Sequence, residues 1–335
     1  MSALPTAIEV PDAPIARNAP CLILNPRSFL ASRGRLAARV IALAARCGTE
    51  VIEASSPAQL NADLDTLRAR GQARIFILAG DGTIQGLVQY LALLPEGAWS
   101  PELLLLGGGR SNLVANDLGG PGTLQRLERA LRRDRNGSAF TVREQQLLRV
   151  EHEDSVPHHG FFFAGSSIDS GIRLCHHHRL SGTSRLHKGR LSSPYCLLKL
   201  ALQVMVGRSP LPPYPDLQIC TDTGESLTGP SRIFIVTTLQ HRDSLYNPYA
   251  ARGTGAVRVT AISATADRFW RRLPALLVGR FDLQMNSHNG YLSGRFERLE
   301  VLGLSRYALD GEMFDVDPTK PVIFRGGQTI RFLQP

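Results

Sequence analysis

The feature that most constrains this chain is an apolar segment that runs directly into a glycine-flanked aspartate. Residues 75–79 predict a buried β-strand, and Gly80-Asp81-Gly82-Thr83 and a helical pattern over 84–94 follow it. Glycines let backbone amides approach an anion closely, and the N-terminus of the following helix offers a positive dipole end. The segment therefore indicates a phosphate-binding loop, although a tight turn in which Asp81 bonds its own backbone is the alternative.

Two side chains of this loop carry further expectations. Asp81 stands where a carboxylate could hold a magnesium ion or accept a proton. Thr83 is expected to cap the helix.

The first part of the chain alternates apolar runs with amphipathic ones. The expected strands are 21–24, 50–54, 75–79 and 103–106, and the expected helices are 35–46, 59–70, 84–94 and 111–116. Strands that are apolar throughout and separated by helices form parallel sheets covered on both faces. The sequence therefore predicts an N-terminal open parallel α/β nucleotide-binding domain over residues 19–139, after a flexible arm over 1–18.

The pattern changes from about residue 140. Short β-like runs at 161–164, 217–220, 233–238, 257–262 and 299–302 are separated by Gly, Pro, Asp and Asn. They predict a second, larger and mostly antiparallel β domain over 140–320, with a loop and one helix over 180–215. A last strand-like piece at 328–333 is expected to return to one of the two domains, within a C-terminal segment over 321–335.

Two further expected strands end in polar, glycine-rich or turn-forming loops. Asn25-Pro26-Arg27-Ser28 follows the first strand, and Gly107 to Asn112 follows the fourth. In a parallel sheet these loops and the loop at Gly80 emerge at the same edge, where open α/β sheets bind nucleotides. Their convergence favours a nucleotide site over isolated turns.

Late in the chain, Asp310 and Glu312 flank Gly311. On an extended strand both carboxylates would point to the same side. A surface turn is the alternative.

The formal net charge of +9 is carried almost wholly by arginine, since the only lysines are Lys188, Lys199 and Lys320. Guanidinium groups suit phosphates and anionic surfaces, although a solvated arginine-rich surface explains the charge equally well. Nucleic-acid binding rests on charge alone and ranks last, so no nucleic acid is expected as a partner.

Five cysteines without a C-x-x-C spacing indicate neither a disulfide framework nor a thiolate zinc site. The first 20 residues lack the pattern of a signal peptide, and the apolar stretch 195–206 is too short to span a bilayer. We therefore expect a cytoplasmic protein with peripheral contact to the inner face of the membrane. The formation of a homodimer stays an open alternative.

Four motifs occur in a characteristic order: Asn25-Pro26-x-Ser28, Gly80-Asp81-Gly82-Thr83, Gly109-x-x-Asn112 and Leu309-Asp310-Gly311-Glu312. Together they resemble the signature motifs of the diacylglycerol kinase catalytic-domain family, which includes bacterial lipid kinases and the sphingosine and ceramide kinases. The resemblance spans residues 21–332. It implies a second domain of the β-sandwich type, a final segment that returns toward the first domain, and an ATP site between the two domains.

The resemblance also implies an activity and its residues. The activity is transfer of the γ-phosphoryl group of ATP, with Mg²⁺, to a lipid hydroxyl at a membrane surface. Asp81 and Glu312 would be catalytic, and Asp81 and Asp310 would hold the metal. The residues expected around the nucleotide are Asn25, Ser28, Ser55, Gly80, Asp81, Gly82, Thr83, Gly109, Arg110, Ser111 and Asn112.

The chain departs from the family pattern at several positions. Ala79 replaces a glycine, Leu113 and Gly86 stand where acidic residues are usual, and Thr254-Gly255 stands for an Asp-Gly pair that organises a structural magnesium. These departures indicate a divergent subgroup, with altered lipid choice or reduced activity. The alternatives are an NAD kinase, which shares the G-D-G-T loop, and a non-enzymatic lipid or nucleotide sensor.

Two clusters are given less weight. Residues 175–178 (Cys-His-His-His) and His158-His159 are expected to be solvated polar residues, because adjacent histidines lack a fixed ligand spacing. Arg271 and Arg272, next to Phe269 and Trp270, predict either a patch for anionic lipid or a solvated basic face.

Overall fold

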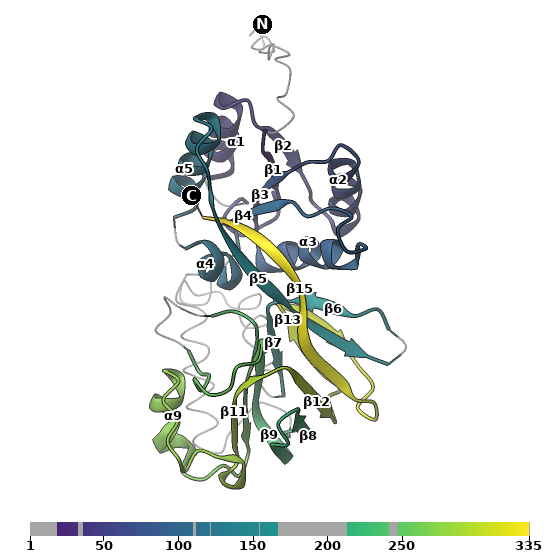
Figure 1. The fold of residues 1–335 in the computed structure, drawn as a ribbon, viewed down its shortest axis with the longest axis vertical. Coiled ribbons are helices and arrows are strands. Elements are labelled where there is room, and N and C mark those ends of the chain that lie inside the picture. The colour runs from purple at the N-terminus through teal and green to yellow at the C-terminus, as the bar shows by residue number, and fades with distance from the viewer. Residues whose placement is uncertain are drawn as a thin grey trace, which may run out of the picture.

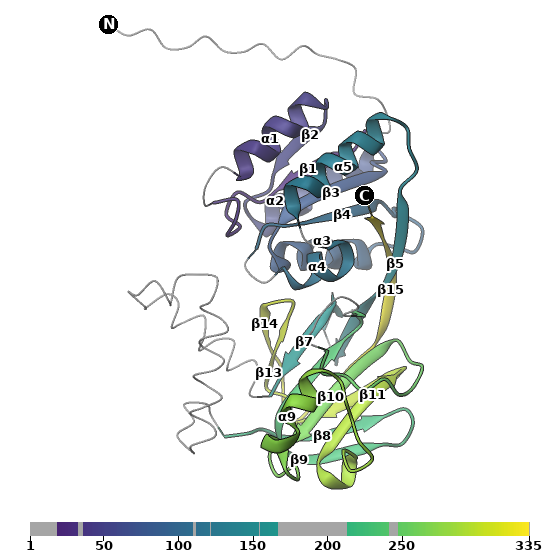
Figure 2. The same cartoon turned by 90° about the vertical axis from the view of Figure 1, so that its left-hand side faces the viewer.

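A computed structural model of the chain describes residues 19–32, 36–109, 112–120, 122–153, 155–166, 213–240 and 247–334. Several expectations lie outside these residues: the arm over 1–18, the loop and helix over 180–215 as far as residue 212, and residues 175–178. In the described part, an α/β part lies at one end of the molecule and antiparallel strands lie at the other (Figures 1 and 2).

The α/β part contains the predicted parallel sheet, with neighbouring strands in the order β2-β1-β3-β4. The strands are β1 (Cys21–Leu24), β2 (Glu50–Glu53), β3 (Arg74–Ala79) and β4 (Glu102–Gly107). The helices are α1 (Leu36–Arg46), α2 (Pro57–Ala69), α3 (Asp81–Leu93), α4 (Leu113–Gly119) and α5 (Thr123–Arg135).

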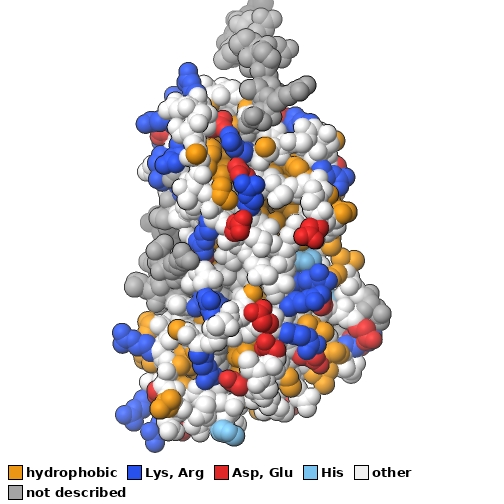
Figure 3. Space-filling model, in the orientation of Figure 1, with side chains coloured by type: hydrophobic (Ala, Val, Ile, Leu, Met, Phe, Trp, Pro, Cys, Tyr) orange, Lys and Arg blue, Asp and Glu red, His pale blue; other side chains and the backbone are white. Residues whose placement is uncertain are grey.

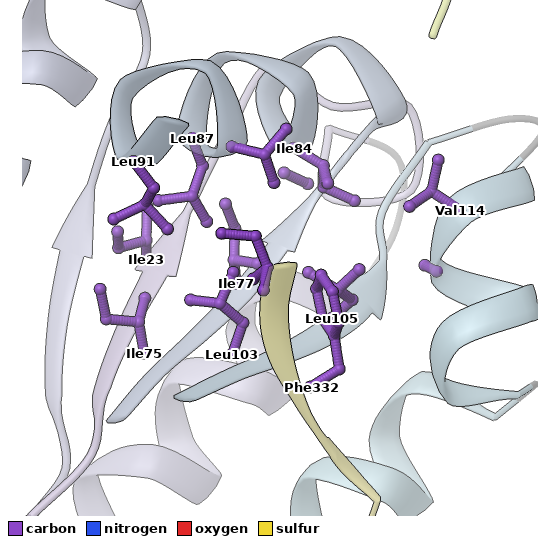
Figure 4. Packing of buried hydrophobic residues seen from close by; sticks show 14 of the residues in the cluster. Ile23, Ile75, Ile77, Ile84, Leu87, Leu91, Leu103, Leu105, Val114 and Phe332 are labelled. Atoms are coloured by element: carbon purple, nitrogen blue, oxygen red, sulfur yellow. The ribbon is translucent and has the colours of Figure 1, made fainter. Parts of the chain in front are cut away.

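Side-chain alternation along these strands explains why both faces of the sheet are covered. In β3, Ile75 and Ile77 face the cluster formed with α2, α3 and α4, whereas Phe76 and Leu78 face α1 and α5. Strands β1 and β4 alternate in the same way. Figure 4 shows the first cluster, with Ile84, Leu87 and Leu91 of α3 above the sheet and Val114 of α4 beside it.

The β part is built from antiparallel strands in two layers around a main core. Its strands are β5 (Thr141–His152), β6 (His158–Gly160), β7 (Phe162–Gly165), β8 (Asp216–Thr221), β9 (Ser226–Thr237), β10 (Val257–Ser263), β11 (Tyr291–Phe296), β12 (Arg298–Leu302), β13 (Arg306–Leu309), β14 (Glu312–Asp315) and β15 (Val322–Gln334). Helix α9 (Phe269–Leu277) and the short helix η1 (Ser287–Asn289) follow β10. The core lies between β8, β12, β15 and β5 on one side and β13, β7, β9, β10 and β11 on the other.

The long strands β5 and β15 join the two parts. They pair antiparallel from Thr141↔Gln334 to His152↔Val322, with one irregularity between Gly326 and Thr329. The end of β15 also pairs in parallel with β4, through Phe332↔Leu103. The final segment therefore returns to the α/β part, as the resemblance implied, and one mixed sheet runs through both parts. The two predicted domain boundaries stay a prediction.

Several elements were not predicted from the sequence. Helix α5, the 12-residue strand β5, strand β11, the hairpin β13–β14 and helix α9 are new, and β15 begins at Val322 rather than at residue 328. Helix α4 covers Leu113–Gly119, so the expected helix over 111–116 was placed too early.

The prediction that His158 and His159 are solvated is wrong. His159 is 3% exposed, and the half-buried His158 stacks on Phe314 with ring centroids 4.1 Å apart. The Tyr307 hydroxyl lies 2.7 Å from His158 Nδ1 and 2.7 Å from His152 Nε2, so it can donate to one ring and accept from the other. Through Tyr307, His152 and His158 thus link β5 and β6 to β13.

Burial makes the stability that His158 and His159 contribute depend on pH. Burial lowers the pKa of His158 and of His159 to about 4, and neighbouring positive groups act in the same direction. A histidine with a folded-state pKa below its unfolded value binds fewer protons when folded. Its contribution to stability is therefore lost as the pH falls from about 6.5 to about 4.

We expect His159→Leu to reduce the pH dependence of unfolding. Between pH 7 and pH 4 the wild type should lose about 3 kcal/mol more unfolding free energy than the variant, the equivalent of the shift at this buried ring. Urea denaturation at the two pH values measures the difference. His288→Gln, at an exposed position of η1, is the control and should follow the wild type. Equal pH dependence in all three proteins would contradict a neutral buried His159.

Candidate active site

The loops after β1, β3 and β4 meet at the carboxyl edge of the parallel sheet. The Leu30 amide donates to the Gly108 carbonyl at 2.7 Å, and the Gly108 amide donates to the Ala79 carbonyl at 2.8 Å. Asn25 Nδ2 donates to Thr83 Oγ1 at 2.8 Å, which joins the first loop to α3. The predicted convergence of the three loops is confirmed.

Glycine is required where these loops touch. A Cβ atom on Gly109 would lie 2.8 Å from Gly80 Cα, and one on Gly108 would lie 3.0 Å from both Ala79 N and Ser28 Oγ. Real Cβ atoms essentially never show the first distance, and the second is tighter than nine in ten of their contacts, so a side chain at Gly109 would push the loops apart and one at Gly108 would strain them. The glycines thus keep a surface of bare backbone at the start of α3, which a phosphate group can approach.

The N-terminus of α3 is open to an anion. Its N-cap is Gly80, which has no side chain, so no side-chain hydrogen bond caps the helix. The expected cap by Thr83 is wrong, because Thr83 lies inside the helix and its hydroxyl accepts from Asn25. Nearby, the buried Ser28 Oγ has no hydrogen-bond partner among the described residues. A helix N-terminus that no side chain caps and a buried hydroxyl donor suit the oxygens of a phosphate chain.

Asp310 lies in a turn and not on an extended strand, which corrects the expectation drawn from its spacing to Glu312. Leu309 pairs with Glu312, so Asp310 and Gly311 are the two central residues of the β13–β14 hairpin. Both have positive φ, 49° and 96°, as a type I′ turn requires. The Asp310 and Glu312 side chains therefore do not project from the hairpin in the same direction.

The Asp310 carboxylate turns inward, is 6% exposed and accepts two backbone amides. The Phe161 amide donates to Oδ2 and the Phe162 amide to Oδ1, each at 2.9 Å. Burial raises the pKa of Asp310 to about 8, the two amides oppose that shift, and the negative charge of Asp81 adds to it. Asp310 thus fixes the hairpin to the junction of β6 and β7, close to Asp81.

Glu312 is the acidic residue that reaches the first turn of α3. Its side chain is exposed, and its Oε1 occupies the place that a Cβ on Gly82 would take. The hairpin therefore brings a solvent-accessible carboxylate against the glycine that follows Asp81. This contact joins residues far apart in the sequence.

The other predicted nucleotide residues have different surroundings. Asn112 holds its own loop, because its Oδ1 accepts from the Gly109 amide at 2.7 Å and its Nδ2 donates to the Gly109 carbonyl at 3.0 Å. Ser55 lies just after β2, at the same sheet edge, and its hydroxyl donates to Gln59 Oε1 at 3.0 Å. Arg110 and Ser111 lie outside the described residues. Their roles as nucleotide ligands stay predictions.

Sequence reasoning missed two glutamines that fix α3 to the β part. Gln85 Nε2 donates to the His159 carbonyl at 3.1 Å, and Gln89 Oε1 accepts from the His159 amide at 2.6 Å. Gln89 Nε2 also donates to the Pro157 carbonyl at 3.0 Å. Two amides four residues apart among the buried apolar residues of α3 were the available signal.

The departures from the family pattern have local explanations. Leu113 begins α4 and packs against the cluster of Figure 4. A Cβ on Gly86 would lie 3.4 Å from Leu60 of α2, so this face of α3 lies close to a neighbouring helix. Gly255 packs directly on the backbone of Phe296, where a Cβ would overlap the chain.

The described residues contain no group of three or more His, Cys, Asp or Glu side chains that could hold a metal. Among the helices described, none has the length and apolar character needed to cross a bilayer.

Comparison with known proteins agrees with this geometry. Residues 20–142 match the family model described as diacylglycerol kinase catalytic domain. The match confirms the resemblance noted from the motifs over this part of the chain, which holds the first three of the four motifs. The match supports a function of the lipid-kinase type. A comparison with curated proteins gives no match.

Solved structures from Bacillus anthracis str. Sterne share the fold over nearly the whole chain. One, described as "a putative diacylglycerol kinase", is 13% identical with a TM-score of 0.64. Another, described as a diacylglycerol kinase, is 12% identical with a TM-score of 0.58. Each alignment covers 95% of this chain and 97% of the other. At this identity the likeness establishes the fold.

The amide contacts predict the effect of Asp310→Asn. Asparagine also tolerates positive φ, but its NH₂ group would face one of the two backbone amides that the carboxylate now satisfies. We expect a loss of about 1–3 kcal/mol in unfolding free energy, measured by chemical denaturation at pH 7. Asp315→Asn, on the same hairpin and paired only at the surface with Arg306, should change stability by less than about 1 kcal/mol. A stable Asp310→Asn protein would show that these amide contacts are dispensable.

Proposed function

We propose that this chain is an ATP-dependent lipid kinase that transfers the γ-phosphoryl group of ATP to a hydroxyl of a lipid. The observation that carries the proposal is the approach of Glu312 to Gly82, beside the uncapped N-terminus of α3. It combines a carboxylate able to accept a proton with a backbone surface suited to a phosphate chain. The match of residues 20–142 to the diacylglycerol kinase catalytic domain supports the same reaction class.

Binding of the nucleotide would rest on the three loops. The amides at the start of α3, the Ser28 hydroxyl and the loop at Gly108 and Gly109 would surround the phosphates, and Ser55 would lie toward the nucleoside. Because this surface is formed by a sheet edge and a helix end held in place by Asn25, the phosphates meet donors that need little reorganisation.

In the transfer step, the lipid hydroxyl oxygen forms a bond to the γ-phosphorus, and the bond from that phosphorus to the β–γ bridging oxygen breaks. The hydroxyl proton passes to Glu312 or, in the alternative, to Asp81. ADP and the phosphorylated lipid are the products. Glu312 is the better placed acceptor, because its exposed carboxylate is accessible to an incoming lipid.

Magnesium bound to the phosphates would supply neutralisation of their charge. Asp81, at the first position of α3, is placed to hold such an ion together with the nucleotide. Asp310 could act as a ligand only by weakening its bonds to the Phe161 and Phe162 amides. We therefore assign Asp81 as the main protein ligand and Asp310 as the residue that positions the hairpin.

A phosphotransfer screen tests the proposal. Purified protein is incubated with radiolabelled ATP, magnesium and mixed micelles of diacylglycerol, ceramide, sphingoid bases or phosphatidylglycerol, with NAD as a soluble acceptor. Label in a lipid is the expected result and identifies the acceptor. Label in NADP alone would identify an NAD kinase, and ATP binding without any labelled product would identify a sensor.

Glu312→Gln separates the two candidate proton acceptors. If Glu312 accepts the proton, this variant should lower kcat by about 10²–10⁴-fold with ATP affinity retained, since the chain loses a general base. Asp81→Asn should instead weaken binding of the magnesium–ATP complex. The rate of labelled-lipid formation and the equilibrium binding of ATP measure the two effects. Asp315→Asn is the matched control, and full activity of Glu312→Gln would remove Glu312 from the mechanism.

Gly82→Ala tests the contact between Glu312 and α3 by a change on the helix. The new methyl group would take the place of Glu312 Oε1, which lies at the end of a flexible side chain. We expect a near-normal melting temperature and a kcat at least about tenfold below wild type, because the carboxylate is displaced from its position. Unchanged kcat would show that the approach of Glu312 to α3 is not needed for turnover.

A further inference from the structure

Helix α9 and the turn after it expose apolar side chains next to arginines. The α9 surface, as we define it, consists of Trp270, Arg271, Pro274, Leu277, Val278, Arg280 and Leu283. Trp270 is 38% exposed, Leu277 40%, Val278 48% and Leu283 93%. Figure 3 shows hydrophobic and Lys or Arg atoms side by side at the lower left, where Figure 1 places α9.

The exposed apolar residues share one face of the helix. Trp270, Pro274 and Leu277 follow the i, i+4, i+7 spacing of a single stripe, and Val278 continues it. The opposite face carries Phe269 and Leu276, which are buried in a core cluster with Ile262, Met285 and Tyr291. Since the helix already has a buried face, the outer stripe is not needed to attach α9 to the fold. Single exposed apolar residues are common, but a continuous stripe marks an interaction site.

Trp270 is held in position by an arginine beneath it. The Arg232 guanidinium lies 4.3 Å from the Phe269 ring centroid and 5.7 Å from the Trp270 ring centroid, and it donates to the Ala264 carbonyl at 2.7 Å. The rings of Phe269 and Trp270 meet edge to face, 5.0 Å apart. An ordered indole loses little conformational freedom on binding, and its amphipathic ring suits the boundary between lipid headgroups and acyl chains.

The charge around the stripe is positive on its exposed side. Asp267 pairs with Arg268 and Arg272, and Asp282 lies 4.0 Å from Arg272. No carboxylate of the described residues forms an ion pair with Arg271 or Arg280, and both arginines are exposed. The acidic neighbours are thus neutralised by other arginines, which leaves two guanidinium groups beside the apolar stripe.

We propose that the α9 surface is where this protein docks on an anionic lipid bilayer, with the stripe inserted at the headgroup boundary and Arg271 and Arg280 on lipid phosphates. The proposal deepens the function proposed above, because a lipid kinase must reach its acceptor at a membrane. A symmetric contact between two copies fits less well, since an isologous interface would bring Arg271 and Arg280 of both copies together without carboxylate partners. The sequence had left a solvated basic face as the alternative, and the continuous apolar stripe argues against it.

Binding to vesicles without nucleotide tests the docking surface apart from catalysis. Wild-type protein is sedimented with vesicles of phosphatidylcholine alone or of phosphatidylcholine with phosphatidylserine. We expect binding only to the anionic vesicles, weakened by added salt, because the arginine contribution is screened. Equal binding to both vesicle types, or to neither, would overturn the proposal.

Two sets of variants separate the apolar and the charged contributions. Trp270→Ala with Leu277→Ser, and separately Arg271→Glu with Arg280→Glu, should each weaken vesicle binding by about tenfold or more. Leu93→Ser removes a leucine that is 50% exposed on α3 and should bind like wild type. Circular dichroism melting confirms that each variant is folded, and the charge variants keep the test decisive if the apolar pair destabilises α9.

Further readouts distinguish the failure of this proposal from the failure of the kinase assignment. Glu312→Gln should bind vesicles normally, and the α9 variants should keep wild-type turnover of a short-chain, water-soluble acceptor once one is known. Sedimentation velocity tests the alternative that a second copy of the chain covers the α9 surface. A wild-type dimer that dissociates when Trp270→Ala and Leu277→Ser are introduced together would establish that alternative. Unaltered vesicle binding in both α9 variants would also overturn the docking proposal.

Discussion

The pairing of β5 with β15 is the constraint on which the arrangement of this protein depends. The two strands run side by side from the parallel sheet into the antiparallel part, and the end of β15 extends the parallel sheet beside β4. Everything between His152 and Val322 is therefore an insertion whose ends are held together by backbone hydrogen bonds. The cost of closing so long a loop grows only slowly with its length, so the chain can place a large β part there. This closure brings the β13–β14 hairpin back to the carboxyl edge of the sheet.

Closure of a long insertion does not by itself fix the position of the β13–β14 hairpin. Specific side-chain contacts are needed as well. Gln85 and Gln89 bind β6 to α3, and the Asp310 carboxylate binds the hairpin to the amides at the β6–β7 junction. The chain of contacts thus runs from α3 through β6 to the hairpin and returns to α3 at Glu312 and Gly82. The links through Gln85, Gln89 and Asp310 use backbone groups that burial would otherwise leave unsatisfied. For this reason, the stability of the fold and the geometry of the site depend on the same interactions.

Sequence reasoning succeeded where local pattern determines structure. The apolar run of β1 predicted its bounds, and the parallel order made the meeting of the three loops a necessary consequence. It missed α5, although the apolar residues of this helix recur every third or fourth position and its last turn is arginine-rich, which is the pattern of an amphipathic surface helix. Asp310-Gly311 carried the Asp-Gly signal of a two-residue hairpin, but it was interpreted as extended chain. The burial of His158 and His159 depends on Tyr307 and α3, which no local pattern reveals.

The three carboxylates of the site divide their roles by environment. Asp310 is buried, and both of its carboxylate oxygens accept backbone amides, so this group is committed to holding the hairpin in place. Glu312 is exposed, lies against a glycine and has a flexible side chain, so it can follow an incoming hydroxyl. A structural Asp310, an Asp81 at the start of the helix and an adaptable Glu312 form an arrangement that suits the phosphoryl transfer we propose, a reaction in which positioning and charge stabilisation contribute most of the catalysis.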